Sequence, residues 1–242
     1  MTGVGSGVAA IGKTMEAVAR KRGNDRDSGY KLDPLGWYVE DAASVDQLLD
    51  HEDFSGHLVW DPACGTGNIL DRCALRGLDT CGTDVRDRGA GGRHPFQISS
   101  FLTDEFPYWN RRSFPLAIVC NPPYGRLHKP MPRGDSYAER FCRRALAHGA
   151  EKIAMLVNGK FLWSERRWRL FEVDHPPTQI LFLSDRPSMP PGTERERLAA
   201  EGRLGKGGSI DFAWLLWVRG AERRAPKWLR PSSAIGIAAG KE

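Results

Sequence analysis

Residues 58–68 read Leu-Val-Trp-Asp-Pro-Ala-Cys-Gly-Thr-Gly-Asn, and this stretch decides the fold. The apolar run from Leu58 to Asp61 predicts a strand, and the residues after Gly67 predict a helix that continues to about Arg76. Between them, two glycines let the backbone turn tightly and come close to a ligand, and the helix N-terminus offers free N–H groups to a carboxylate. The third position of a G-x-G-x-x-G pattern is Leu70, which disfavours a pyrophosphate-binding dinucleotide site.

The next predicted strand, Thr80 to Thr83, ends in Asp84. An acid about 20 residues beyond a glycine turn, at the end of the neighbouring strand, is placed to accept both hydroxyls of a ribose. Taken alone, a strand-terminal aspartate is more often a helix cap or a turn residue. The glycine turn before it favours the ribose role.

Asn121-Pro122-Pro123-Tyr124 follows the apolar run Pro115 to Cys120 and predicts a buried strand that stops abruptly, because proline cannot continue a ladder. A polar side chain is thereby held at the carboxyl edge of the sheet, where ligands bind in open parallel α/β sheets. If the Asn121 oxygen and the Pro122 carbonyl accept both N–H bonds of a ring amine, the lone pair of that amine is freed for reaction. Tyr124 is then expected to stack on the ring. A proline-rich turn after a core strand is the structural alternative.

These stretches resemble the S-adenosylmethionine-dependent amino-methyltransferases. Residues 61–67 match the cofactor motif D-P-A-C-G-T-G, and residues 121–124 match the motif [DNS]-P-P-[YFW] residue for residue. Other segments resemble phage- and prophage-type DNA methyltransferases, namely Asp87-Arg88-Gly89, residues 186–192, residues 205–209 and residues 212–217. The resemblance covers about residues 30–220.

The fold that this resemblance implies is an α/β, Rossmann-like class I methyltransferase fold. We expect a seven-stranded, mostly parallel sheet with helices on both faces and one antiparallel strand near the C-terminal edge. The predicted organisation is a flexible basic N-terminal segment at 1–29, a methyltransferase domain at 30–220 and a basic C-terminal tail at 221–242.

The implied activity is transfer of a methyl group from S-adenosylmethionine to the N6 amino group of adenine in DNA, with the base flipped out of the duplex. No metal is expected, because the sulfonium already makes the methyl group electrophilic. Methylation of an RNA base amino group or of a protein glutamine amide are alternatives, because all present an amide-like nitrogen. A catalytically silent nucleic-acid-binding module is a further alternative, which an intact Asn121 and glycine turn disfavour.

The resemblance also implies the roles of individual residues. The implied catalytic residues are Asn121, Pro122, Pro123 and Tyr124. The implied cofactor-binding residues are Tyr38, Val39, Glu40, Asp61, Ala63, Gly65, Gly67, Asn68, Asp84, Phe101 and Asn121. In the family, residues like Tyr38 to Glu40 cover the methionine end of the cofactor, and a phenylalanine like Phe101 stacks on its adenine. The family usually has an acid just before this phenylalanine, but this chain has Ser99-Ser100 there.

The net charge of +5 is spread unevenly over the 242 residues. Residues 126–144 contain six Lys or Arg against two acids, which suits a polyanionic substrate next to the predicted active edge, although a solvated helix face gives the same pattern. Residues 158–171 mix aromatic and basic side chains, so they fit either a nucleic-acid surface or a helix with Leu162, Trp163 and Leu170 in the core. The predicted substrate-binding residues are Arg126, Lys129, Arg133, Lys160 and Arg186.

Five cysteines, odd in number and never spaced as C-x-x-C, indicate reduced thiols in a cytoplasm and argue against a zinc site or a disulfide frame. No run of 18 apolar residues occurs and the N-terminus lacks a signal-like apolar region, so we expect no membrane partner. The expected partner is nucleic acid, with double-stranded DNA favoured, and the expected state is a monomer or weak dimer.

Overall fold

The computed structural model describes residues 36–105, 114–124, 136–202 and 208–231. The chain divides into two units, Met1–Tyr30 and Lys31–Glu242, and every described residue belongs to the second. The predicted basic segment 1–29 therefore lies outside the described residues. Arg126, Lys129 and Arg133 lie outside them as well.

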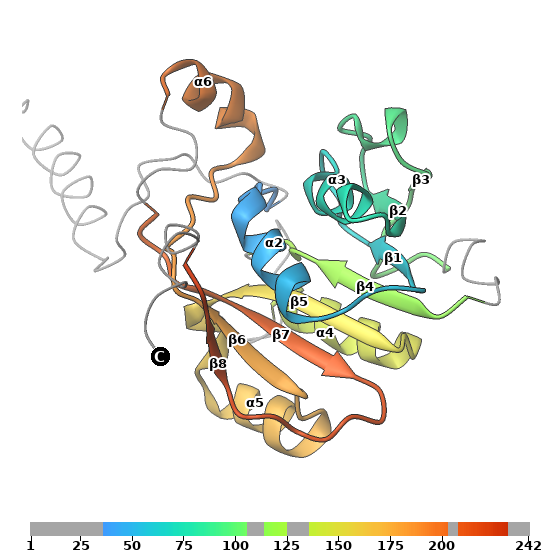
Figure 1. The fold of residues 1–242 in the computed structure, drawn as a ribbon, viewed down its shortest axis with the longest axis vertical. Helices are drawn as coiled ribbons and strands as arrows, with labels where there is room; N and C mark the ends of the chain where they lie inside the picture. The colour runs from blue at the N-terminus through green and yellow to red at the C-terminus, as the bar shows by residue number, and fades with distance from the viewer. Residues whose placement is uncertain (1–35, 106–113, 125–135, 203–207, 232–242) are drawn as a thin grey trace, which may run out of the picture. The chain divides into compact units, whose positions relative to one another are not determined.

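A mixed sheet of eight strands, in the order β3-β2-β1-β4-β5-β7-β6-β8, forms the centre of the described chain (Figure 1). The first five strands of that order are parallel, whereas β7 runs antiparallel to both of its neighbours, β5 and β6. The strands are β1 (Leu58–Asp61), β2 (Asp79–Asp84), β3 (Phe96–Ile98), β4 (Leu116–Cys120), β5 (Lys152–Asn158), β6 (Gln179–Leu183), β7 (Phe212–Val218) and β8 (Lys227–Leu229).

The continuous apolar sequence of β4 follows from burial on both faces of the sheet. Ile118 and Cys120 pack into one core cluster, whereas Ala117 and Val119 pack into the other. Because successive side chains of a strand point to opposite faces, a parallel strand covered on both sides needs no polar residue. The expectation of a mostly parallel sheet with helices on both faces is confirmed.

Helices cover both faces of the sheet, and the two core clusters show which helix lies on which face. α2 and α3 pack with Val59 and Ala117, whereas α4 and η4 pack with Ile118 and Cys120. The helical elements are α2 (Ala42–His51), α3 (Asn68–Leu75), η1 (Ala90–Gly92), α4 (Tyr137–His148), η3 (Gly159–Leu162), α5 (Glu165–Trp168), η4 (Arg169–Asp174), η5 (Gly192–Glu194) and α6 (Arg195–Ala200). The Ser136 hydroxyl caps α4 by accepting the Glu139 N–H.

The eighth strand departs from the seven expected. β8 pairs in parallel with β6 and lies within residues 221–242, which the sequence assigns to a basic tail. Leu229 is buried, and the Ser184 hydroxyl donates to the Leu229 carbonyl at 2.5 Å. A strand of three residues is too short to show an alternation of apolar and polar side chains in the sequence. Only its pairing with β6 in the structure defines it as a strand.

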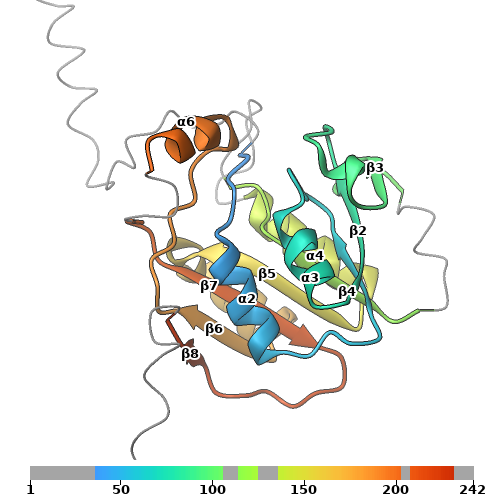
Figure 2. The ribbon, with the colours of Figure 1, turned by 45° about the horizontal axis from the view of Figure 1, so that its top comes forward.

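The long connection between β6 and β7 folds back onto the segment that precedes α2. The Val39 N–H donates to the Pro190 carbonyl and the Gly192 N–H to the Trp37 carbonyl, both at 3.1 Å. Accordingly, α6 lies beside the chain that leads into α2 (Figure 2). A Cβ at Gly192 would meet the Trp37 indole at 2.2 Å, so only glycine allows this close approach. No helix within the described ranges has the length and apolar character needed to cross a membrane.

All five cysteines are buried and free. Burial raises the pKa of each thiol, to about 12 for Cys73 and for Cys142. Since the thiolate is the reactive form, we expect a disulfide reagent at mildly alkaline pH to label none of them in the folded protein. All five should react after unfolding in urea. Rapid labelling of the folded protein would contradict the burial of these side chains.

Candidate active site

The turn between β1 and α3 is built from two glycines with left-handed backbone angles. Gly65 has φ 53° and Gly67, the N-cap of α3, has φ 90°. Residues with a side chain rarely adopt this conformation, so glycine is required at both positions. The Asp61 carboxylate accepts the Ala63 N–H at 3.0 Å and fixes the start of the turn. The α3 N-terminus is thereby set at the carboxyl end of β1.

Asp84 ends β2 beside this turn, where the sequence places a ribose acceptor. Its carboxylate accepts the Gly65 N–H at 3.0 Å and the Arg86 N–H at 3.1 Å, and it forms an ion pair with Arg88. The Arg88 guanidinium also lies over the Trp37 ring, 4.7 Å from its centroid. A carboxylate has about four acceptor sites, so Asp84 retains room for a ligand hydroxyl.

A cavity of about 370 Å³ opens over Asp84 and the carboxyl ends of β1 and β4. Several residues predicted from the sequence line it, namely Tyr38, Ala63, Asp84, Phe101, Asn121 and Pro123. Residues to which the sequence gave no site role also line it, among them Trp37, Arg88, Tyr137 and Phe141. The cavity thus combines a carboxylate, apolar and aromatic walls and one amide.

Asn121 is held in one orientation. Its Nδ2 donates to the Tyr38 carbonyl at 3.0 Å and to Glu40 Oε2 at 3.2 Å. Because a backbone carbonyl can only accept, the amide nitrogen must be the atom that faces Tyr38. The Asn121 Oδ1 atom is buried and has no hydrogen-bond partner within the described residues. A buried acceptor without a partner costs about 1–3 kcal/mol, so this atom is suited to accept an N–H from a ligand.

Two buried carboxyl groups lie near Asn121. Burial raises the pKa of Glu40. Burial, together with the nearby carboxylate of Glu40, raises the pKa of Asp61 well above its usual range. A cationic ligand beside them would offset both effects, because an opposite charge favours the ionised form. In the part of the chain that the structure describes, no cluster of His, Cys, Asp or Glu could hold a metal ion.

Tyr124 does not line the cavity. Its hydroxyl donates to the Leu156 carbonyl of β5 at 2.6 Å, and its ring lies 6.3 Å from that of Phe212. Tyr124 packs against the core cluster that contains α2 and β7. The Tyr38 side chain lines the cavity, and its ring centroid lies 6.5 Å from that of Tyr124. Stacking of Tyr124 on a base stays a prediction.

Replacing Tyr124 with phenylalanine should therefore affect stability more than activity. The variant loses one hydrogen bond to the β5 backbone, which should lower the free energy of unfolding by about 1 kcal/mol. Urea unfolding measures that change. The ring is retained, so the rate of the methyl transfer that the sequence predicts should stay close to that of the unmodified protein. A large loss of rate in a folded variant would show that the hydroxyl itself acts in the reaction.

Val39, Glu40 and Asn68 line a second cavity of about 410 Å³, which also borders α3 and the connection between β6 and β7. Arg195, at the start of α6, reaches into this region and donates to Asn68 Oδ1 at 2.9 Å. Asn68 in turn donates to the Glu40 carbonyl at 3.3 Å. The connection between β6 and β7 therefore supports the turn that the sequence assigns to the cofactor.

The predicted substrate-binding residues are less closely grouped than the cofactor residues. Lys160 is exposed on η3, and Arg186 pairs with Asp211 at 2.8 Å. Three residues that line the two cavities were given no site role from the sequence, namely Trp37, Arg88 and Arg195. Arg88 follows Asp84 by four residues, a spacing that could have suggested a pair. Arg195 has no comparable signal, because its partners lie more than 120 residues away.

The chain was compared with known proteins. No family model matches it. Over 85 residues, 29% of this chain, it is 36% identical to a tRNA (guanine(10)-N(2))-methyltransferase of Schizosaccharomyces pombe, of which the match spans 18%. A modification subunit of an inferred type I restriction enzyme from Vibrio vulnificus has a TM-score of 0.53 at 16% identity, over 88% of this chain and 49% of that one. An inferred RNA methyltransferase from Pyrococcus horikoshii also has a TM-score of 0.53 at 16% identity, over 86% of this chain and 98% of that one.

These likenesses, together with the strand order and the antiparallel β7, show a Rossmann-like class I methyltransferase fold. The chain spans about half the length of the modification subunit and aligns with less than a fifth of the curated tRNA enzyme.

Proposed function

We propose that this protein transfers a methyl group from S-adenosylmethionine to an exocyclic amino group of a nucleic-acid base, and that the base is adenine in DNA, methylated at N6. The observation that carries the proposal is the Asn121 Oδ1 atom. It is buried and unpartnered within the described residues, and it belongs to an amide whose other end is fixed by Tyr38 and Glu40.

The described residues fit S-adenosylmethionine. Asp84 offers an acceptor for a ribose hydroxyl, and Phe101 and Phe141 provide an apolar wall for a planar base. Glu40, which contacts Asn121 at 3.2 Å, and the neighbouring Asp61 place two carboxyl groups beside Asn121, where they can offset the positive charge of the sulfonium. When bound, S-adenosylmethionine supplies an electrophilic methyl group on its sulfonium.

The protein's own residues are proposed to activate the target amine as a nucleophile. An exocyclic amine is a poor nucleophile because its lone pair is delocalised into the ring. Asn121 Oδ1 and the Pro122 carbonyl are proposed to accept its two N–H bonds, which favours a tetrahedral nitrogen with a free lone pair. The acceptor is preorganised, because Tyr38 and Glu40 already hold the amide in place, and so little reorganisation is needed in the transition state. The base must leave the duplex to reach Asn121.

A second candidate is the N2 amino group of guanine in tRNA, favoured by the similarity to the Schizosaccharomyces pombe enzyme. Guanine N2 is also an amine conjugated with its ring, so the Asn121 acceptor suits both targets. Methylation of a protein glutamine amide uses the same chemistry, but the excess of basic residues supports a polyanionic substrate.

The deciding experiment supplies isotopically labelled S-adenosylmethionine together with duplex DNA, tRNA or protein. Each product is digested and analysed by mass spectrometry. N6-methyladenine from DNA is the expected product, and N2-methylguanine from tRNA would instead support the second candidate. If no labelled base forms with any nucleic acid, while cofactor binding is intact, the proposed function is wrong.

A further inference from the structure

Two tryptophans beyond the carboxyl end of β5 are exposed to solvent. The side chains of Trp163 and Trp168 are 77% and 62% exposed, and neither ring packs against another ring within the described ranges. The indole is the largest apolar side chain, and folding gains most by burying it. Two exposed indoles within six residues indicate a surface that binds something.

The backbone between the two tryptophans, at the junction of η3 and α5, is strained. Ser164 has φ 149° and ψ 163° and is the only described residue other than glycine with a positive φ. This region of the backbone map is almost restricted to glycine, and such strain clusters at functional sites. The Ser164 hydroxyl accepts the Arg167 N–H at 3.4 Å, so the serine also caps α5. The sharp turn at Ser164 comes directly after Trp163, which lies outside the core while Phe161 is buried.

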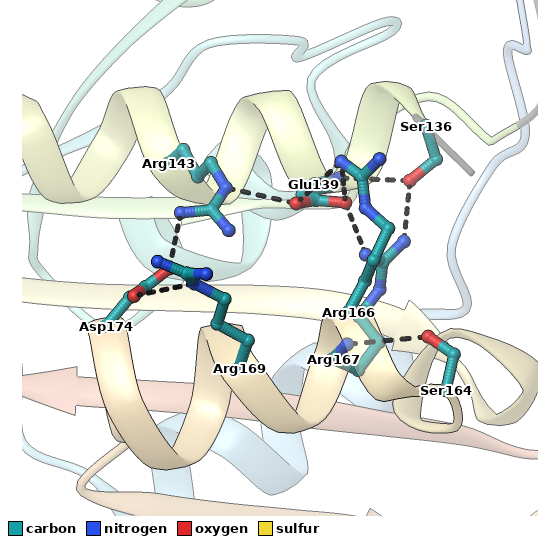
Figure 3. A network of polar contacts seen from close by, with 8 residues as sticks. All are labelled: Ser136, Glu139, Arg143, Ser164, Arg166, Arg167, Arg169 and Asp174. Carbon is teal, nitrogen blue, oxygen red and sulfur yellow. Dashed lines mark hydrogen bonds and ion pairs between the residues drawn. The ribbon is translucent and has the colours of Figure 1, made fainter. Parts of the chain in front are cut away.

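An ion network centred on the buried pair Glu139 and Arg167 links α5 to α4 (Figure 3). Glu139 pairs with Arg143, Arg166 and the buried Arg167, while Asp174 pairs with Arg143 and Arg169. Four guanidinium groups thus face two carboxylates, which leaves an excess of positive charge. Arg169, the first residue of η4, keeps 73% of its side chain exposed although it pairs with Asp174. The contacts of Arg166 and Arg167 with Glu139 fix the position of α5, which ends at Trp168.

We infer that Trp163, Arg166, Trp168 and Arg169, here named the tryptophan–arginine surface, bind an unpaired strand of nucleic acid next to the target base. The inference rests on the proposed function and specifies its substrate. Indole faces stack on bases, and guanidinium groups contact phosphates, which is how single strands are bound without sequence preference. In a duplex the base faces already stack on one another. An exposed indole can therefore stack on an unpaired base but not on a paired one. The excess of positive charge matches a polyanion better than an apolar protein partner.

The position of this surface suits a strand that leaves the active site. β4 and β5 are parallel neighbours, with Cys120 paired to Met155, so Asn121 and the end of β5 lie at the same edge of the sheet. Phe161, directly before the surface, packs in the same core cluster as Phe101 and Phe141, which line the cavity. Nucleotides flanking a base in the cavity would therefore extend toward Trp163.

The test measures binding of fluorescently labelled single strands of about 12 nucleotides, as DNA and as RNA, and of the matching duplexes. The variants are Trp163→Ala, Trp168→Ala and both together. Trp228→Ala is the matched control, because Trp228 is 69% exposed but stacks on Phe182 at the β8 edge of the sheet. We expect Trp163→Ala and Trp168→Ala each to weaken single-strand binding at least about fivefold, which is the cost of losing one stacked base. The double variant loses two stacked bases and should bind at least about 25-fold more weakly. Duplex affinity and the control should be unchanged.

A charge variant tests the phosphate contacts. Arg169→Gln should reduce the slope of log affinity against log salt by about 0.7 for a single strand. Arg197→Gln on α6, which also removes an exposed arginine, should leave the slope unchanged. Stronger loss with RNA or with DNA single strands would identify the source of the unpaired segment.

Wild-type single-strand affinity in the double tryptophan variant would overturn the inference, and so would an equal loss of duplex binding. A change of oligomeric state on sedimentation, without loss of oligonucleotide binding, would assign the surface to self-association and overturn it too. Product analysis separates this inference from the proposed function. If oligonucleotide binding behaves as expected but no methylated base forms, the proposed function fails and the surface stands. If methylated base forms and the tryptophan variants bind normally, the surface fails and the function stands.

Discussion

Asn121→Ala is expected to slow methyl transfer at least about 100-fold, the usual cost of losing one preorganised hydrogen-bond partner of a transition state. The hydrogen bond from the target amine to Oδ1 matters chiefly as that amine becomes tetrahedral, so the effect should fall on the rate more than on binding. Cofactor affinity, measured by calorimetry, should change little. Single-turnover transfer with labelled cofactor measures the rate. Full turnover in a folded variant would rule out the amino-methyltransferase assignment.

Asn158→Ala is a matched control for this experiment. Asn158 ends the neighbouring strand β5, and its side chain accepts the Phe161 N–H at 3.1 Å. Its loss removes the cap of η3 and should cost about 1 kcal/mol of stability. No comparable loss of rate is expected, since Asn158 does not line the cavity.

The contact with Glu40 makes a further distinction. Asn121→Asp keeps an acceptor, but places a second carboxylate at the 3.2 Å contact with Glu40, where like charges repel. Adding Glu40→Gln restores a donor to that contact. The double variant should therefore transfer methyl groups faster than Asn121→Asp alone, and an equal or slower rate would show that Glu40 does not position Asn121.

Asp84→Ala is expected to weaken cofactor binding by roughly 1–3 kcal/mol, the cost of losing charge-assisted hydrogen bonds. The carboxylate also holds the Gly65 N–H and the Arg88 guanidinium, so its loss loosens the glycine turn as well. Calorimetry with the cofactor product, S-adenosylhomocysteine, measures the dissociation constant.

Asp79→Ala is the matched control, because Asp79 begins the same strand and is exposed. It should leave the dissociation constant unchanged. Equal affinities in the two variants would mean that Asp84 is only a turn residue.

Local signals predicted the elements that carry the site. The glycines at 65 and 67, the strand that ends in Asp84 and the prolines after Asn121 each fix the backbone within a few residues. Because these features are determined by residues adjacent in the sequence, they could be predicted from the sequence alone.

Distant contacts could not be predicted in this way. The approach of Gly192 to Trp37, the reach of Arg195 to Asn68 and the Tyr124 hydrogen bond to Leu156 join residues far apart in the chain. The aromatic and basic stretch at 158–171 shows the same limit. Its sequence fitted either a nucleic-acid surface or a helix with Trp163 and Leu170 in the core. In the structure Leu170 and Phe161 are buried in the core, whereas Trp163 is exposed. Tertiary packing decides such cases, because periodicity alone does not separate them.

The place of β7 in the sheet bears on how the protein is made. β7 lies between β5 and β6 yet follows both in the chain, so a ribosome must synthesise the chain through Val218 before either strand gains this partner. Until then the edges of β5 and β6 stay open, and open apolar edges favour aggregation of a nascent chain. Fragments that end before residue 212 should accordingly be recovered in inclusion bodies or bound to chaperones. The sheet that carries the cofactor site is therefore expected to be completed only after Val218 has been synthesised.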